Sequence, residues 1–234
     1  KYVINSKIWV SLKLKIKNLL IRLLEEKNTL FAIKIIPFLP EINQECVIDI
    51  SPKINLILNE QDINIRKFAP AAILKLSEYQ SPSSSYRLGM NLIKQALIEE
   101  SLEMKLEILK SFHEPYPKYL SFPNVLDSFS VLLHEDSFEV KQVTLKILGG
   151  IYHYNPIIIA PIFRSSLLDI LYICNSSKSL RIQSEATRCL PIIFSSLKEN
   201  MPIYVPVFLP IAIQYLKQHL AITIGDSDFP TQHK

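Results

Sequence analysis

Few side chains in this sequence have the types and the spacing that chemistry requires. Two cysteines, Cys174 and Cys189, lie on apolar helical patterns, and a group of glutamates follows residue 98: Glu99, Glu100, Glu103 and Glu107. Carboxylates work as an acid and base pair only where opposed environments separate their pKa values. A cysteine is a nucleophile only where a base or positive charge favours its thiolate. The glutamates have the spacing of an exposed helix surface and neither cysteine has a visible base, so we expect no catalytic residue.

Metal and cofactor sites are not indicated either. The five histidines are scattered, and none stands three or four residues from a cysteine or another histidine, as paired zinc ligands on a helix would. No glycine-rich phosphate loop occurs. Asp228-Phe229-Pro230 matches part of the metal-binding tripeptide of protein kinases but lacks its glycine and its companion motifs. We expect neither a metal nor a cofactor in this segment.

Composition favours an all-α intracellular chain. Apolar residues make up 48% of the 234 residues, which is ample for a core, and glycine is scarce. The net charge of +4 is too small to indicate a nucleic-acid partner. The cysteines (Cys46, Cys174 and Cys189) are odd in number and form no Cys-x-x-Cys pair, so we expect a cytoplasmic protein, which could also lie at endomembrane surfaces. Because it has no signal peptide and no initiator Met, we expect a piece of a longer protein.

Asn155 to Leu197 is the clearest structural unit, and it predicts two helices joined by a short turn. Asn155 suits an N-cap, and Pro156 suits the first helical position, where its missing N–H costs nothing. Residues 175–179 interrupt the apolar pattern, and Ser179 is expected to cap a second helix that carries Ile182, Ala186, Cys189, Ile193 and Phe194. One such hairpin cannot bury both of its apolar faces, so it needs similar neighbours.

Similar hairpins recur along the chain. The start of the second helix aligns in four copies: Ile65-Arg66-x-x-Ala69, Met104-Lys105-x-x-Ile108, Val140-Lys141-x-x-Thr144 and Ile182-Gln183-x-x-Ala186. A polar residue suited to cap a helix stands three residues before each copy (Asp62, Ser101, Ser137 and Ser179), although Asp136 with Glu139 could form a capping box instead. A weaker fifth copy centres on Ala32. Two helices per repeat of roughly 40 residues match HEAT-type repeats.

These patterns predict an all-α fold, a single α-solenoid of about five to six HEAT-type hairpins. The expected units are residues 5–40, 51–80, 86–113, 124–153, 155–198 and 201–221, the last one incomplete, followed by a polar tail at 222–234. We expect a loop over 81–85, where Ser81-Pro82 fits a proline-directed phosphorylation site. Pro70 should kink or delay the helix that Asp62 begins. A non-repetitive helical bundle is the alternative.

Two segments raise the question of lipid or RNA contact. Asn5 to Glu26 is basic and apolar and predicts a helix, although Leu12 to Lys17 also alternates as a strand does. Its lysines could touch acidic lipids or RNA, but we expect a solvated helix face and no nucleic acid. Met201 to Leu216 has no charge, yet it holds three prolines and is shorter than the ~20 residues of a span, so we expect no membrane span.

A series of motifs stands between about Val131 and Leu220: Leu132-Leu-His-Glu-Asp-Ser-Phe-Glu-Val140, Tyr154-Asn155-Pro156, Pro161-Ile-Phe-Arg164, Arg181-Ile182 with Ala186-Thr-Arg188-Cys-Leu190, and Tyr204-Val205-Pro206 with Leu209-Pro210. In these motifs the sequence resembles the HEAT-repeat region of the TOR (target of rapamycin) protein kinases. Ser165 and Pro191 depart from the family pattern, in which a basic residue and a glycine are usual at these places.

The resemblance implies a scaffold far N-terminal of a kinase domain, without catalytic residues of its own. In that family the solenoid forms a curved arm that helps the kinase to dimerise and that holds accessory subunits such as the Raptor-type protein. The parent protein would be a Ser/Thr kinase of nutrient and growth signalling, with ATP and Mg bound in its kinase domain. The alternatives are an importin-like or adaptor solenoid, for which Trp9 alone is no support, and a small enzyme built on helices.

Overall fold

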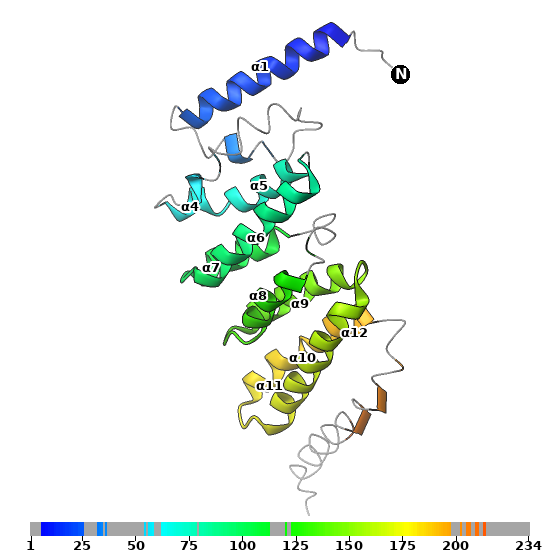
Figure 1. The fold of residues 1–234 in the computed structure, drawn as a ribbon. Helices are drawn as coiled ribbons and strands as arrows, with labels where there is room; N and C mark the ends of the chain where they lie inside the picture. Colours follow the sequence, from blue (N-terminus) through cyan, green and yellow to red (C-terminus); the bar gives the residue numbers. More distant parts are fainter. Residues whose placement is uncertain are drawn as a thin grey trace, which may run out of the picture. The chain divides into compact units, whose positions relative to one another are not determined.

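The computed structural model describes residues 6–25, 32–34, 36, 54, 56–58, 62–78, 80–112, 120, 123–197, 202, 205–206, 209–210 and 213. Within these ranges the chain is helical or forms short turns, and none of these residues lies in a strand (Figure 1). The all-α prediction is therefore confirmed for the described part of the chain. The chain divides into two compact units, Lys1–Leu132 and Leu133–Lys234.

The first unit begins with α1 (Ser6–Glu25). This helix confirms the prediction over residues 5–26 and shows that the strand alternative for Leu12 to Lys17 is wrong. Its Leu20 is 3% exposed, whereas Leu14 is 55% exposed. Most of the expected helices over 29–38 and from Ser51 lie outside the described residues, as does Cys46; the residues described there include Ile33, Ile36 and Ile54, and these three are fully buried.

Proline divides the next helical stretch into α4 (Ile63–Arg66) and α5 (Ala69–Ser77). A helix through this region would need an N–H on Pro70 to bond the carbonyl of Arg66, and proline has none. The chain therefore turns at Lys67 and Phe68, and α5 begins with Pro70 in its first turn, where no donor is needed. The expectation that Pro70 kinks or delays this helix is confirmed.

The helix α6 (Pro82–Ile98) begins earlier than the sequence pattern indicated. Ser81 is its N-cap, and its Oγ accepts a hydrogen bond from the backbone N–H of Ser84 (3.3 Å). The Ser85 hydroxyl donates to the carbonyl of Ser77 (2.7 Å), which ties the start of α6 to the end of α5. The prediction of a loop over 81–85 is therefore wrong, because the cap-and-proline pair that starts the helix after Asn155 also occurs at Ser81-Pro82.

Two further helices complete the description of this part of the chain. α7 (Leu102–Lys110) follows α6 after the short join at Glu99-Glu100, and it packs on both α5 and α6. α8 (Pro123–Leu133) buries Val125, Phe129 and Leu132 and ends at the boundary between the units. The expected link from His113 lies almost wholly outside the described residues.

The second unit is built on α9 (Phe138–Tyr152) and α10 (Pro156–Ser176). α9 contacts α10 and α12, and the rings of Tyr152 and Phe163 lie 5.7 Å apart across the α9–α10 contact. A Cβ on Gly149 would collide with the side chain of Ser196 on α12. Glycine therefore allows α9 and α12 to approach closely.

The second helix of this hairpin is interrupted. The structure has α11 (Leu180–Thr187), a turn at Arg188 and Cys189, and then α12 (Leu190–Leu197), where the sequence pattern predicted one continuous helix. Pro191 has no N–H to bond the carbonyl of Thr187, so the helix ends there and restarts. Pro191 thus acts as Pro70 does in the first unit.

The four predicted caps are N-caps in the structure. Asp62 Oδ1 accepts from the backbone N–H of Asn64 (2.8 Å). Ser101 Oγ accepts from Met104 (3.3 Å) and Ser137 Oγ from Val140 (3.4 Å). Ser179 occupies the same position without a capping bond from its side chain. Because Ser137 is the cap, the alternative capping box of Asp136 and Glu139 is wrong.

Candidate protein-interaction surface

The glutamates that were considered above as catalytic candidates form ion pairs and hydrogen bonds with neighbouring residues. Glu99 Oε1 lies 3.3 Å from Arg66 Nη2 and also accepts from the backbone N–H of Ser101 (3.2 Å). Glu107 pairs with Lys110 on the same helix (3.5 Å). In the part of the chain that the structure describes, no group of three or more His, Cys, Asp or Glu side chains could hold a metal ion. Glu99 therefore holds the turn before α7, whereas Glu107 forms an exposed ion pair within that helix.

The two described cysteines, Cys174 and Cys189, are buried and are not joined by a disulfide. Burial raises the pKa of the Cys189 thiol to about 11, and the nearby charge of Lys141 offsets this only in part. The Cys174 Sγ lies 3.5 Å from Thr187 Oγ1, and Cys189 Sγ lies 3.8 Å from the carbonyl oxygen of Glu185. A thiol that stays protonated at neutral pH is a poor nucleophile. The geometry therefore gives Cys189 a packing role.

One position of the aligned repeat has the same burial in all four copies. It is the fifth and last position, and its residues are all 0% exposed: Ala69, Ile108, Thr144 and Ala186. Small or β-branched side chains at this place allow the second helix to lie close against its neighbours. The burial is the same although Ala69 is the first residue of α5, after the helix break, whereas Thr144 lies inside the continuous α9.

The first repeat position is not equivalent across the copies. Met104 and Val140 are fully buried, Ile65 is half-buried, and Ile182 is 42% exposed. α11 buries only Ala186, so Ile182 lies on its outer side beside exposed Leu180 and Arg181. The sequence grouped Ile182 with core residues because it has the right type and spacing, whereas its exposure depends on which neighbour covers that side.

The second repeat position carries a long polar side chain whose head finds a partner. Arg66 pairs with Glu99, and Lys141 Nζ lies 5.1 Å from the centre of the Phe138 ring. In the fourth copy Gln183 Nε2 donates to the carbonyl of Ser177 (2.8 Å). Lys105 is 8% exposed. Such residues bury their stems along apolar surface. Their polar heads are satisfied only in part, because the buried Arg66 Nε and Gln183 Oε1 have no hydrogen-bond partner among the described residues.

Several residues that the sequence analysis singled out in the hairpin of residues 155–198 lie on the outer face of α10. Asn155 is the N-cap and Pro156 the first residue, as predicted, although the Asn155 side chain makes no capping bond. Exposed side chains then recur along one side of the helix and form what we call the α10 stripe: Ile157 (84% exposed), Pro161, Arg164, Leu168 (39%) and Tyr172 (71%). Their spacing of three or four residues places them on one helix face.

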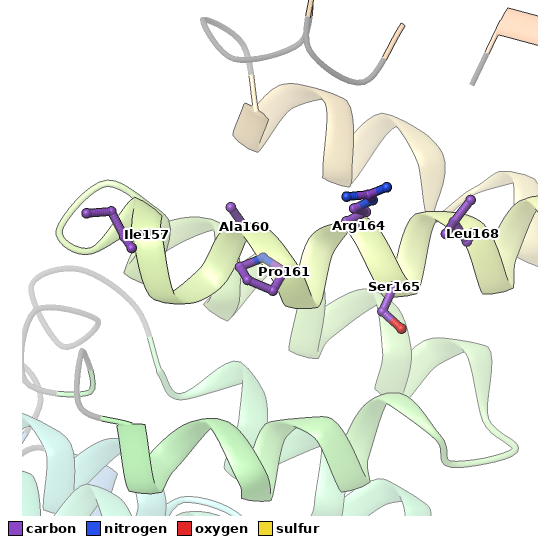
Figure 2. Close-up of a pocket in the computed structure, with 6 residues that line it drawn as sticks. All are labelled: Ile157, Ala160, Pro161, Arg164, Ser165 and Leu168. Atoms are coloured by element: carbon purple, nitrogen blue, oxygen red, sulfur yellow. The ribbon is translucent and has the colours of Figure 1, made fainter. Parts of the chain in front are cut away.

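A hollow of about 480 Å³ lies along this face. It is lined by α10 residues: Ile157, Ala160, Pro161, Arg164, Ser165 and Leu168. Figure 2 shows Ala160, Arg164 and Leu168 pointing to one side of the helix, while Ser165 points to the other. Such a shallow, mainly apolar surface with one guanidinium suits contact with protein better than capture of a small molecule.

α10 is apolar on two opposite sides. Its inner side buries Ile159, Phe163, Leu167 and Ile170, and the helix contacts α9, α11 and α12. Among the described residues it is also the helix long and apolar enough to cross a membrane, a test that core helices of soluble proteins pass as well. A helix that is apolar all round needs cover on both sides. The apolar run from Ile157 is visible in the sequence, but the sequence does not show which of its sides faces the neighbouring helices.

Positive side chains occur on α10, at the turn between α10 and α11, and on both ends of α11. Arg164, Lys178 and Arg181 are exposed and form no ion pair with the described residues, whereas Arg188 pairs with Glu185 (3.2 Å). Unpaired cations beside exposed apolar residues favour an acidic protein surface as neighbour.

Comparison with known proteins finds distant, partial similarity. No family model matches the chain. It is 22% identical over 99 residues, 42% of the chain, to the serine/threonine-protein kinase mTor of Drosophila melanogaster. It is also 22% identical over 165 residues, 67% of the chain, to the serine/threonine-protein kinase TOR2 of Saccharomyces cerevisiae. A third match, 18% identical over 114 residues and 49% of the chain, is the serine/threonine-protein kinase tor1 of Schizosaccharomyces pombe.

These matches cover little of the relatives. The chain spans 4% of the Drosophila protein, 7% of TOR2 and 5% of tor1. The chain is therefore a helical segment with distant similarity, over part of its length, to a region of the TOR serine/threonine kinases.

Proposed function

We propose that this chain is part of the N-terminal HEAT arm of a TOR-like serine/threonine kinase and serves as a scaffold, without catalysis of its own. The partial similarity to three TOR kinases carries the proposal. The capped helical hairpins, with their buried fifth repeat position, support the HEAT-type interpretation, because each hairpin needs a similar neighbour to cover its second face.

A solenoid of five to six such hairpins would act by holding surfaces at fixed places. Each repeat contacts only its neighbours, so the arm grows by stacking and offers long surfaces instead of one pocket. The proposed partners are the accessory subunits of a TOR-like complex, including a Raptor-type protein, and a second copy of the kinase. ATP and Mg belong to the kinase domain of the parent protein. The proposed location is the cytoplasm, with access to membrane surfaces through the complex.

The cations at the α10–α11 turn are the proposed points of contact. Lys178 and Arg181 are exposed and unpaired among the described residues, so an acidic subunit surface could bind them without first breaking an ion pair. Charges of this kind at the edge of an interface speed association and set orientation more than they add affinity.

Crosslinking mass spectrometry on the native full-length assembly, purified through a tag, tests this function. Crosslinks from Lys178 or Lys141 to a Raptor-like subunit or to a second large kinase are expected, and Lys198, which lies outside the described residues, is a further reporter. Lys105 is the internal control, because at 8% exposure it should not react in the folded protein. Crosslinks to transport cargo or to a nucleoporin would refute the kinase arm and favour the importin-like alternative.

A further inference from the structure

The helix α1 carries an excess of positive charge that the rest of the chain lacks. Its 20 residues include four lysines, one arginine and one glutamate, so five cations against one anion give it a net charge of +4. The whole chain of 234 residues has the same net charge, so the residues outside α1 balance to zero. A cationic segment of this kind attracts anionic surfaces.

Leucines accompany these cations on the exposed side of α1. Leu12 is 44% exposed and Leu19 is 55% exposed, and their separation of two helical turns places them on one face. Lys15 and Arg22 are exposed, and each follows one of these leucines by three residues; we call the four residues the α1 outer stripe. Among the described side chains of α1, Leu20 is the buried one, at 3% exposure, so neighbouring residues cover only part of the apolar surface of this helix.

We propose that the α1 outer stripe binds an anionic membrane surface, with the helix lying in the plane of the lipid headgroups. In this arrangement Leu12 and Leu19 enter the boundary with the acyl chains, while Lys15 and Arg22 reach the headgroup phosphates through their long side chains. Among the described helices α10 is apolar enough to cross a membrane and α1 is not, which favours a surface position for α1. The proposal does not require the kinase arm, because here lipid contacts this chain directly.

The combination of leucines and cations favours a lipid surface over RNA. The sequence predicted a solvated face for the lysines, and Lys15 is exposed, but a solvated face does not need the exposed pair of Leu12 and Leu19. RNA binds cations and stacks on aromatic side chains, and exposed leucines add little to either contact. Interfacial helices combine apolar burial with attraction to acidic lipids, so both residue types contribute to binding.

Flotation of the full-length protein with vesicles tests the proposal. The protein should float with vesicles of phosphatidylserine and phosphatidylcholine in equal parts, and about tenfold less with phosphatidylcholine alone. Raised salt should weaken binding to the anionic vesicles, because it screens the attraction between the cations of α1 and the headgroups. Lys15→Gln should weaken this binding about fivefold. Absence of flotation with the anionic vesicles overturns the proposal.

Two leucines of α1 supply a matched pair of variants. Leu14 and Leu19 are both 55% exposed, and their separation of five residues places them about 140° apart around the helix. Leu19→Asp should weaken binding to anionic vesicles about tenfold, since it removes apolar burial. Leu14→Asp adds the same charge to the same helix and should change the binding much less. Equal losses from the two variants, or a loss with Lys15→Gln alone, would mean attraction of charge without insertion and would overturn the proposal.

A second measurement keeps α1 apolar and so protects its folding. A photoreactive benzophenone side chain at position 19 should crosslink to lipid when the full-length protein is irradiated with the anionic vesicles, whereas the same side chain at position 14 should give little lipid adduct. Crosslinks from position 19 to another protein in place of lipid contradict the proposal. The vesicles contain no accessory subunit, so neither result depends on the partners found for the proposed arm.

Discussion

Arg66 Nη2 lies 3.3 Å from Glu99 Oε1, and this ion pair joins the start of the α4–α5 stretch to the turn between α6 and α7. The Glu99 side chain is 8% exposed and the Arg66 side chain 21%. The pair therefore links two hairpins of the first unit through a site that is largely shielded from water.

Replacing Glu99 with Gln should lower the free energy of unfolding by about 1–2 kcal/mol, because the guanidinium keeps its burial but loses its counter-charge. Urea unfolding of the protein, followed by circular dichroism, measures this. Glu107→Gln is the control, since the exposed Glu107–Lys110 pair should contribute less than about 0.5 kcal/mol. Equal effects of the two variants would contradict the role given to Arg66 and Glu99.

Pro161 should be a destabilising residue within α10. It lies inside the helix, where it removes the hydrogen bond to the carbonyl of Ile157. Pro161→Ala should therefore raise stability, by roughly 1–3 kcal/mol, in thermal or urea unfolding. Pro156→Ala, at the first helical position, is the matched control and should change stability little. A loss of stability in Pro161→Ala would show that the ring packs against a neighbour that it needs.

Gly149 should resist substitution although it lies in a helix. Alanine would improve helix propensity by about 1 kcal/mol, but its Cβ would collide with Ser196 at the α9–α12 contact. We expect a net loss of about 1 kcal/mol for Gly149→Ala, since overpacking costs about 1–3 kcal/mol. Gly149→Ala/Ser196→Ala should recover part of this loss, because the nearest colliding atom is the Ser196 Oγ. If the double variant instead lost the sum of the stabilities that the two single variants lose, the result would contradict the collision.

Cys189 should make stability fall at alkaline pH. Its pKa is raised from 9.0 to about 11 in the folded protein, so the unfolded chain loses this proton first. The contribution of the protonated thiol is fully present below pH 9 and is lost as the pH rises to about 11. Urea unfolding between these pH values should show a shallower decline for Cys189→Ala than for the natural protein. Parallel declines would mean that the Cys189 thiol titrates normally.

Arg181 should matter for assembly and not for catalysis. It is exposed and unpaired among the described residues, so Arg181→Ala should change stability by less than about 0.5 kcal/mol. In the full-length protein we expect weaker recovery of accessory subunits with an unchanged KM for ATP. Arg188→Ala, which removes an arginine already paired with Glu185, is the control. A changed KM for ATP with a folded arm would count against the scaffold role.

Local signals made much of the helical framework predictable. N-caps such as Asp62 and Ser137 bond the first turn of their own helix, so three or four consecutive residues are enough to predict them. The N-cap role of Ser81 was not predicted, because a serine-rich stretch resembles a loop. Pro82 nevertheless supplied the same helix-start signal as Pro156. The signal for the helix break before Leu190 is equally local, because Pro191 itself interrupts the helix.

Contacts over long distances could not be predicted in this way. Arg66 and Glu99 are separated by α5 and α6, and nothing in either neighbourhood selects the partner. Ile182 is 42% exposed because no described residue covers that side of α11, and periodicity does not report which side is covered. Burial is a property of the assembled helices, so repeat positions of the same type can end in different surroundings.

The two proline breaks have a mechanical consequence. Pro70 and Pro191 each delete one rung of a hydrogen-bond ladder, and each leaves a two-residue turn between short helices. Bending stiffness is lowest where such a rung is missing. Under tension along the chain, the single-turn α4 and the eight-residue α11 should unwind before the continuous α6 or α9, so the segment can lengthen in small steps while these two longer helices stay intact.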